Sequence, residues 1–220
     1  MKPIMRNYQD ENDFWRIRNF LREVLVLNGL HEKSWPVARL DYWRWHGIKN
    51  CRSNDPLEEV TFLWEMPDGQ IAAVLNPEEF GQVFLQIHPV FKTDKLEEEM
   101  IAFAEERLTV TRAGKRKVAI WVDSEDTLRL NLLKARGYIK GSWTESQWRR
   151  DLDAPITDVP IAAGYTIRSL GDERELPARS WASWRGFHPD EPNEKYKAGS
   201  GTATSSVVRS TAGTWIWSPR

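Results

Sequence analysis

The sequence has little of what would place the protein in a membrane, outside the cell or on nucleic acid. It contains a single cysteine, Cys51, so no disulfide can form within the chain, and its neighbours show no metal-ligand spacing. No run of about 18 apolar residues exists, and the first residues lack the apolar core of a secretion signal. The net charge is -1, so no global basic field attracts nucleic acid. We therefore expect a cytoplasmic protein without a membrane partner or a bound metal.

Tryptophan, in contrast, is abundant. The chain has 12, and several stand beside arginine, as in FWRIR, YWRWH and QWRRD. Aromatic and arginine side chains that alternate can stack on nucleic-acid bases. The alternative is a tryptophan-rich core from which arginines reach the surface. Because the near-zero net charge supplies no attraction to phosphates, we prefer the second interpretation and expect no nucleic-acid partner.

The apolar periodicity predicts a mixed α/β (α+β) chain with the element order β-α-α-β-β-β-α-β-α-β. Residues 4–8 are typical of a short strand, and the helix that follows has apolar residues at spacings of three and four until Gly29. A second helix is expected after Pro36. Two β-rich runs on either side of the Pro-Asp-Gly turn at 67–69 predict a hairpin, and the next strand ends at Pro89.

Two more helices and two more strands are expected after this point. A helix over 94–108 can be capped by Thr93 or Asp94, and Asp94 has capping-box spacing to Glu97. The continuous apolar run at 117–123 predicts a central strand that is buried on both faces. Another helix ends at Gly137, and residues 138–152 predict a final strand.

Composition divides the chain into four parts. Residues 1–152 form the domain just described, and residues 153–164 read as a linker with two prolines. Residues 165–198 repeat the opening plan of short strand, acidic turn and helix, so we expect the start of a second copy. Residues 199–220 are rich in Ser, Thr and Gly and lack acidic residues. They read either as a low-complexity tail or as the out-of-frame remainder of a truncated second domain.

The element order, the run LQIHPVFK before one helix and LLKARGY at the end of the next resemble the GNAT superfamily of acyl-CoA-dependent N-acetyltransferases. The resemblance covers residues 1–152, and the two copies are similar to tandem-domain members such as mycothiol synthase. It implies a GNAT-like fold in which helices flank a mixed central sheet. It also implies transfer of an acetyl group from acetyl-CoA to a small-molecule amine.

In this family a strand leaves backbone groups free for the pantetheine arm, and a basic, glycine-rich turn directs helix amides at the pyrophosphate. Here Lys92 keeps a positive charge, but the turn has no glycine and Asp94 adds a negative charge near the phosphate position. We therefore expect weak acetyl-CoA binding or none. By resemblance, the cofactor-binding positions are Leu85, Gln86, Ile87, His88, Lys92, Thr93, Asp94, Lys95 and Leu96.

The resemblance also shows altered catalytic positions. Leu133 stands where the family often has a tyrosine that donates a proton, and Asp126 lies near the position of a frequent asparagine. Tyr138 fits the aromatic position after the glycine and is expected to pack. Glu65 could act as a base through water, although an exposed strand glutamate is the simpler interpretation. The chain is therefore interpreted as an impaired or incomplete GNAT-type transferase, or as a non-catalytic scaffold or interaction domain of the same fold.

Overall fold

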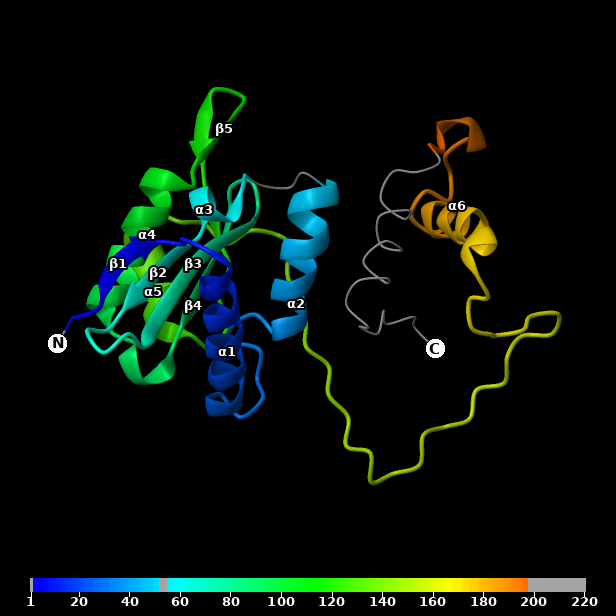
Figure 1. The fold of residues 1–220 in the computed structure, drawn as a ribbon, viewed down its shortest axis with the longest axis horizontal. Coiled ribbons are helices and arrows are strands. Elements are labelled where there is room, and N and C mark those ends of the chain that lie inside the picture. Colours follow the sequence, from blue (N-terminus) through cyan, green and yellow to red (C-terminus); the bar gives the residue numbers. More distant parts are fainter. Residues whose placement is uncertain (1, 52–54, 198–220) are drawn as a thin grey trace. The chain divides into compact units, whose positions relative to one another are not determined.

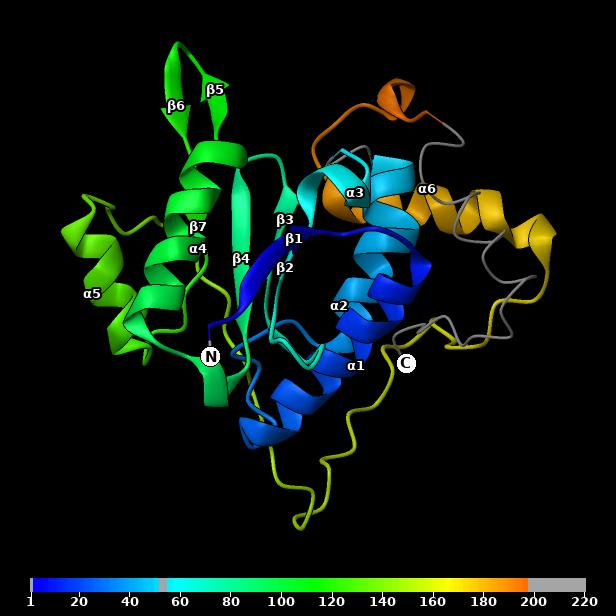
Figure 2. The same ribbon diagram turned by 60° about the vertical axis from the view of Figure 1, so that its left-hand side comes forward.

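The structure is a computed structural model, and it describes residues 2–51 and 55–197. The chain divides into two compact units, Met1–Ser146 and Gln147–Arg220, called here the first and the second unit. The first unit is built on a five-stranded sheet with the strand order β1-β2-β3-β4-β7 (Figure 1). Helices α1 and α2 cover one face of this sheet, and α4 and α5 lie on the other (Figure 2). The predicted tail at 199–220 lies outside the described residues.

The first part of the chain forms the helical layer as predicted. Asp10 caps α1 by accepting a hydrogen bond from the Asp13 N–H. The apolar stripe of α1 turns toward the sheet, and the helix ends just before Gly29, which has a φ of +64°. A helix also follows Pro36, and it continues as a π-helix. The elements are β1 (Ile4–Asn7), α1 (Glu11–Leu27), α2 (Val37–Tyr42), the π-helix η1 (Trp43–Cys51) and the short helix α3 (Leu57–Val60).

The middle of the chain supplies the centre of the sheet. β1 to β4 pair antiparallel in sequence order, and the hairpin predicted around the turn at 67–69 is confirmed, with Gly69 in the turn at a φ of +87°. β2 and β3 carry most of the buried strand residues, among them Phe62, Trp64 and Leu75. The elements are β2 (Phe62–Glu65), β3 (Ile71–Glu79), β4 (Gln82–Ile87), the 3-10 turn η2 (Pro89–Phe91) and α4 (Asp94–Arg107).

A small hairpin that the sequence pattern did not predict follows α4. Strands β5 (Val110–Arg112) and β6 (Lys115–Lys117) pair antiparallel and project from the body of the first unit (Figures 1 and 2). Ala113 and Gly114 form its two-residue turn, with φ values of 50° and 73°. Positive φ at both central residues is the requirement of a type I′ turn. The remaining elements of this unit are β7 (Ala119–Ile120) and α5 (Thr127–Ala135).

The prediction of a central, fully buried strand at 117–123 is wrong. Lys117 belongs to β6 of the small hairpin, and within this run only Ala119 and Ile120 join the main sheet, as β7, which pairs with β4 at its edge. Ala119 is exposed, and its neighbours in this run are at most half-buried. The strand predicted at 138–152 does not form either, so among the described residues nothing pairs with the outer side of β7. Without that strand, an apolar run that would have been internal becomes an edge.

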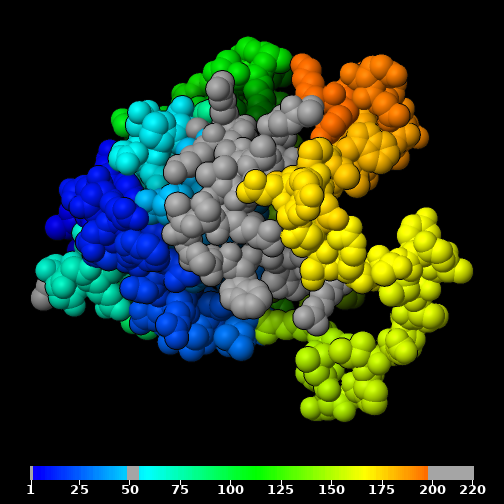
Figure 3. Space-filling view, turned by 45° about the vertical axis from the view of Figure 1, so that its right-hand side comes forward, coloured from blue at the N-terminus to red at the C-terminus, as the bar shows by residue number. Residues whose placement is uncertain are grey.

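The described part of the second unit has no core of its own. None of its side chains from 147 to 197 is fully buried. In Figure 3, the yellow-green residues after about residue 150 form a single extended row. The expected strand near 165–170 is absent, whereas the expected helix forms. The elements are the 3-10 turn η3 (Glu173–Glu175), α6 (Leu176–Phe187) and the 3-10 turn η4 (Asn193–Lys195). Across the described ranges of both units, no helix is both long and apolar enough to cross a bilayer.

Candidate functional site

Strand β4 runs on beyond its parallel neighbour β7. Their ladder ends with a hydrogen bond of 3.0 Å from the Trp121 N–H to the Val83 carbonyl. On the other side, the His88 N–H donates to β3 over 2.9 Å. Because backbone groups alternate between the two sides of a strand in an antiparallel pair, those of Leu85 and Ile87 point away from β3. No strand in the described chain pairs with them there, so an extended ligand can hydrogen-bond to this edge.

The polar side chains of β4 and its end serve the interior of the first unit. Gln86 is buried, and its Oε1 accepts a hydrogen bond of 2.8 Å from the Trp35 N–H. His88 is 3% exposed, and its Nδ1 accepts from the Val90 N–H over 3.2 Å. The other ring nitrogen, Nε2, lies 3.4 Å from a carboxylate oxygen of Glu23 on α1. The side chains of Gln86 and His88 therefore hydrogen-bond within the first unit and hold β4 in place, rather than pointing toward a ligand.

Thr93 is the residue that caps α4. Its Oγ1 accepts a hydrogen bond of 3.3 Å from the Leu96 N–H, whereas Asp94 is the first residue of the helix and is exposed. The predicted capping-box pairing of Asp94 with Glu97 is wrong, because the Glu97 side chain turns into the interior of the unit. Lys95 is also exposed, and Leu96 belongs to the hydrophobic core.

Four charged side chains behind this turn form a network that joins α4 to α5. Lys92 Nζ lies 2.5 Å from Asp126 Oδ2 and 3.6 Å from Glu97 Oε1. Arg129 donates two hydrogen bonds to Glu97, of 2.7 and 3.0 Å, and Glu97 is fully buried. Burial by itself raises the pKa of Asp126, but the hydrogen bond from Lys92 and the charge of Arg129 outweigh it, so this pKa is lowered.

This network neutralises Lys92, the residue whose positive charge the resemblance assigns to phosphate binding. Lys92 and Arg129 face the two carboxylates of Asp126 and Glu97, so the four formal charges cancel. The Lys92 side chain is only 30% exposed, and the two exposed charges at the start of α4, Asp94 and Lys95, have opposite signs. A pyrophosphate at this helix N-terminus would therefore meet little net attraction from side chains.

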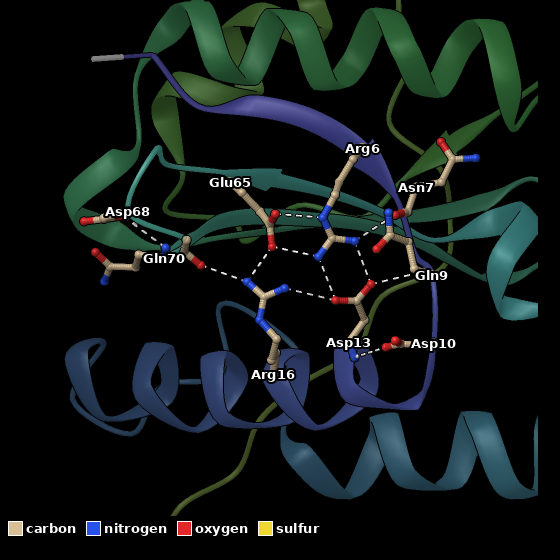
Figure 4. A network of polar contacts seen from close by, with 10 residues as sticks. Arg6, Asn7, Gln9, Asp10, Asp13, Arg16, Glu65, Asp68 and Gln70 are labelled. Carbon is tan, nitrogen blue, oxygen red and sulfur yellow. Dashed lines mark hydrogen bonds and ion pairs between the residues drawn. The ribbon is translucent and has the colours of Figure 1, made fainter.

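Glu65 lies at the end of β2 in a second network (Figure 4). Arg6 donates hydrogen bonds of 2.7 and 2.8 Å to its two oxygens, and Arg16 lies 2.5 Å from one of them. Asp13 binds the same two arginines. Burial by itself raises the pKa of Glu65, but the hydrogen bonds from Arg6 and Arg16 outweigh it and lower this pKa. A carboxylate held in this way is a weak general base.

The other altered positions are structural. Leu133 is buried in the core, and Tyr138 packs against it. Burial first, and the charge of Glu105 second, raise the pKa of Tyr138 well above its ordinary value, so the phenol stays protonated. Within residues 2–51 and 55–197, no group of three or more His, Cys, Asp or Glu side chains is arranged to hold a metal.

Comparisons with known proteins identify the class of fold. No family model and no curated protein matches the sequence. Among solved structures, the chain is similar to a GCN5-related N-acetyltransferase from Sphaerobacter thermophilus, with 19% identity and a TM-score of 0.50. The match covers 87% of this chain and 61% of that one, so this chain spans about three-fifths of that protein's length. The likeness shows the fold: a mixed sheet, mostly antiparallel and flanked by helices, of the GNAT type.

Proposed function

We propose that the first unit is a GNAT-type acetyltransferase domain with an impaired acyl-CoA site, part of a tandem-domain protein. In such a protein, acetyl transfer to a small-molecule amine would belong to a complete second unit. The observation that carries the proposal is the pairing of Lys92 with Asp126 and Glu97, which removes the phosphate-binding charge from the turn. The fold supports the family relationship, and the network supports the impairment.

The two halves of the candidate site suit acetyl-CoA unequally. The backbone edge at Leu85 and Ile87 fits the amide groups of a pantetheine arm, because such an arm pairs as an added strand does. The turn from Lys92 to Leu96 suits the pyrophosphate poorly, since it offers no glycine, Lys92 is paired with carboxylates, and the charge of the exposed Lys95 is offset by the adjacent Asp94. The amides at the start of α4 still favour an anion by about 0.3–1 kcal/mol. We therefore assign no step of acyl transfer to this unit.

The second candidate is a non-catalytic domain of the same fold that acts as a scaffold or interaction domain. Two observations favour it. Leu133 offers no proton to a leaving thiolate, and Glu65 is bound by two arginines rather than available to an amine. A transfer assay with radiolabelled acetyl-CoA and an amine panel separates the candidates. If this chain forms acetylated product and the Glu65→Gln variant does not, the hypothesis of a non-catalytic domain is excluded.

Calorimetric titration with acetyl-CoA tests the proposal directly. We expect the wild-type chain to bind with a Kd weaker than about 0.1 mM. Asp126→Asn keeps a helix-capping side chain but removes one charge from Lys92, so it should tighten binding several-fold. Glu106→Gln, at an exposed position near the other end of α4, is the matched control, because it changes the net charge by the same amount. Submicromolar binding by the wild type that Lys92→Glu abolishes would contradict the proposal.

A further inference from the structure

An arginine and a carboxylate form a clasp at the corner between β1 and α1. Arg6 donates two hydrogen bonds of 2.6 Å to Asp13, one to each carboxylate oxygen. The Gln9 N–H donates to the same carboxylate over 2.9 Å, and Arg6 also reaches the Asn7 carbonyl. This first clasp holds the turn between strand and helix in one geometry (Figure 4).

The second unit contains the same clasp. Arg168 donates hydrogen bonds of 2.8 and 2.6 Å to the two oxygens of Glu175. The Gly171 N–H donates to that carboxylate over 2.8 Å, and Arg168 also reaches the Ser169 carbonyl. Each of these four positions follows its counterpart in the first clasp by 162 residues. An equal offset for every partner is the signature of an internal repeat rather than of a chance surface ion pair.

The two clasps differ in what covers them. In the first, strand β2 pairs with β1 in a register that sets Glu65 opposite Ile4, and Glu65 binds the outer side of Arg6. The Arg6 side chain is 23% exposed and that of Asp13 only 3%. In the second clasp, the side chain of Arg168 is 63% exposed. No other carboxylate of the described chain contacts it besides Glu175.

At the second corner, the apolar side chain that corresponds to Met5 is not covered by a neighbouring strand. Met5 on β1 packs against the core, opposite Trp64 of β2, whereas its counterpart Ile167 is 66% exposed. Residues 198–220 contain neither Asp nor Glu, so this part of the sequence cannot supply the missing carboxylate. A strand that completes the corner in the manner of β2 must bring its own acidic side chain from elsewhere.

We propose that residues 166–169 form an acceptor edge for an antiparallel β-strand of the β2 type. The strand carries a glutamate opposite Thr166, which binds Arg168 as Glu65 binds Arg6, and a large apolar residue opposite Ile167. Backbone hydrogen bonds provide the affinity, and the charge pair fixes the register. This inference rests on the proposed second GNAT-like unit and is independent of whether the first unit binds acetyl-CoA.

A peptide of residues 57–79 is a suitable probe, because it contains β2, its turn and β3 in their natural order. We expect a fluorescently labelled peptide to bind the full chain saturably, as measured by anisotropy. Arg168→Gln in the chain, or Glu65→Gln in the peptide, should weaken binding about tenfold or more, since each removes a charge-assisted hydrogen-bonded pair. Arg168→Lys, which keeps the charge but loses the bidentate fork, should fall between.

Arg174→Gln is the matched control. Arg174 lies in the same turn and pairs with Asp172, but Asn12 stands at the corresponding position of the first unit. This variant should bind the peptide like the wild type. The proposal is overturned if the wild-type chain shows no saturable binding, or if Arg168→Gln and Arg174→Gln bind the peptide equally. Circular dichroism of each variant confirms that the exposed substitutions leave the fold intact, and the acetyl-CoA titration remains a separate result.

Discussion

The two arginine clasps make the same hydrogen bonds in different surroundings. The first lies beside strand β2 and is shared with a second carboxylate, Glu65, whereas the second clasp is open to solvent. A few local residues are enough to form the corner in both places. Among the residues that the structure describes, only the first clasp is held by a sheet and a hydrophobic core. We infer that local sequence determines the geometry of such a corner and that burial determines how much it contributes to stability.

The strongest test of this view compares two ion pairs that join the same helices, α4 and α5. Glu97–Arg129 is buried, whereas Glu105–Arg136 has both side chains about one-third exposed. Arg129→Met should lower the free energy of unfolding by about 3–5 kcal/mol, because the buried Glu97 carboxylate loses both of its hydrogen bonds and keeps only Lys92, at 3.6 Å, as a cation nearby. Arg136→Met should lower it by less than about 1 kcal/mol. Urea denaturation measures both.

A double variant sharpens this test. Glu97→Leu together with Arg129→Met removes both buried charges and should recover most of the stability that Arg129→Met loses, because no unpaired charge remains. If Arg129→Met and Arg136→Met lowered the free energy of unfolding equally, burial would not determine how much these ion pairs contribute to stability.

The second test compares the clasps themselves. Arg6→Gln removes hydrogen bonds to two partly buried carboxylates and should cost about 1–2 kcal/mol, with the lower end favoured because solvent screens part of the site. Arg168→Gln should leave the unfolding midpoint unchanged, since its pair is exposed. Thermal denaturation followed by circular dichroism at 222 nm compares the two variants. A larger loss for Arg168→Gln would contradict our finding that the first unit has a core and the described part of the second unit does not.

The third test uses pH. Burial raises the pKa of Asp13, but the bonds from Arg6, the Gln9 N–H and Arg16 outweigh it, and the pKa is lowered, as it is for Glu65. Carboxyls with a lowered pKa in the folded state stabilise above their unfolded pKa, about 4, and lose this contribution as the pH falls further. The stability difference between wild type and Arg6→Gln should therefore shrink below about pH 4. A difference that stays constant down to pH 2 would contradict the linkage.

The smallest expected effect concerns Glu175. The hydrogen bond from Arg168, with that from the Gly171 N–H, lowers the pKa of Glu175 to about 2. Because the pair is open to solvent, 1 M salt should raise this pKa toward the ordinary value. An NMR titration of the side-chain carboxyl at low and high salt measures the shift. In Arg168→Gln this pKa should lie closer to the ordinary value at both salt concentrations, because only the hydrogen bond from the Gly171 N–H still lowers it.

Local elements could be predicted from the sequence because their signals are local. The apolar stripe of α1, the turn at Gly69 and the stop at Gly137 each act within a few residues, and the structure has a helix, a hairpin and a helix end there. The prediction of a central strand at 117–123 was wrong because apolar composition indicates only a tendency to form a strand. Whether that strand is central or at an edge depends on whether a further strand pairs with it. That strand, predicted at 138–152, does not form.

The sequence predicted where the candidate site lies but not which side chains pair with its charged residues. The resemblance indicated β4 and the turn at Lys92, and it indicated the missing glycines. It did not indicate Glu97 and Arg129, because two side chains on different helices become partners only after the helices pack. The sequence signal that was available is a charged residue inside each apolar stripe, Glu97 beside Leu96 and Arg129 between Leu128 and Leu130. Such residues are buried only when they are paired.

The projecting β5–β6 hairpin also affects how molecules meet at high concentration. In the part of the chain that the structure describes, the outer edge of β7 is unpaired, and such edges recruit strands from neighbouring molecules into aggregates. Here the edge is two residues long and follows directly on three exposed cations, Lys115, Arg116 and Lys117. A second molecule that approached edge to edge would bring the same three charges against them. We therefore expect the charges of the hairpin to disfavour the addition of a strand from a neighbouring molecule at β7.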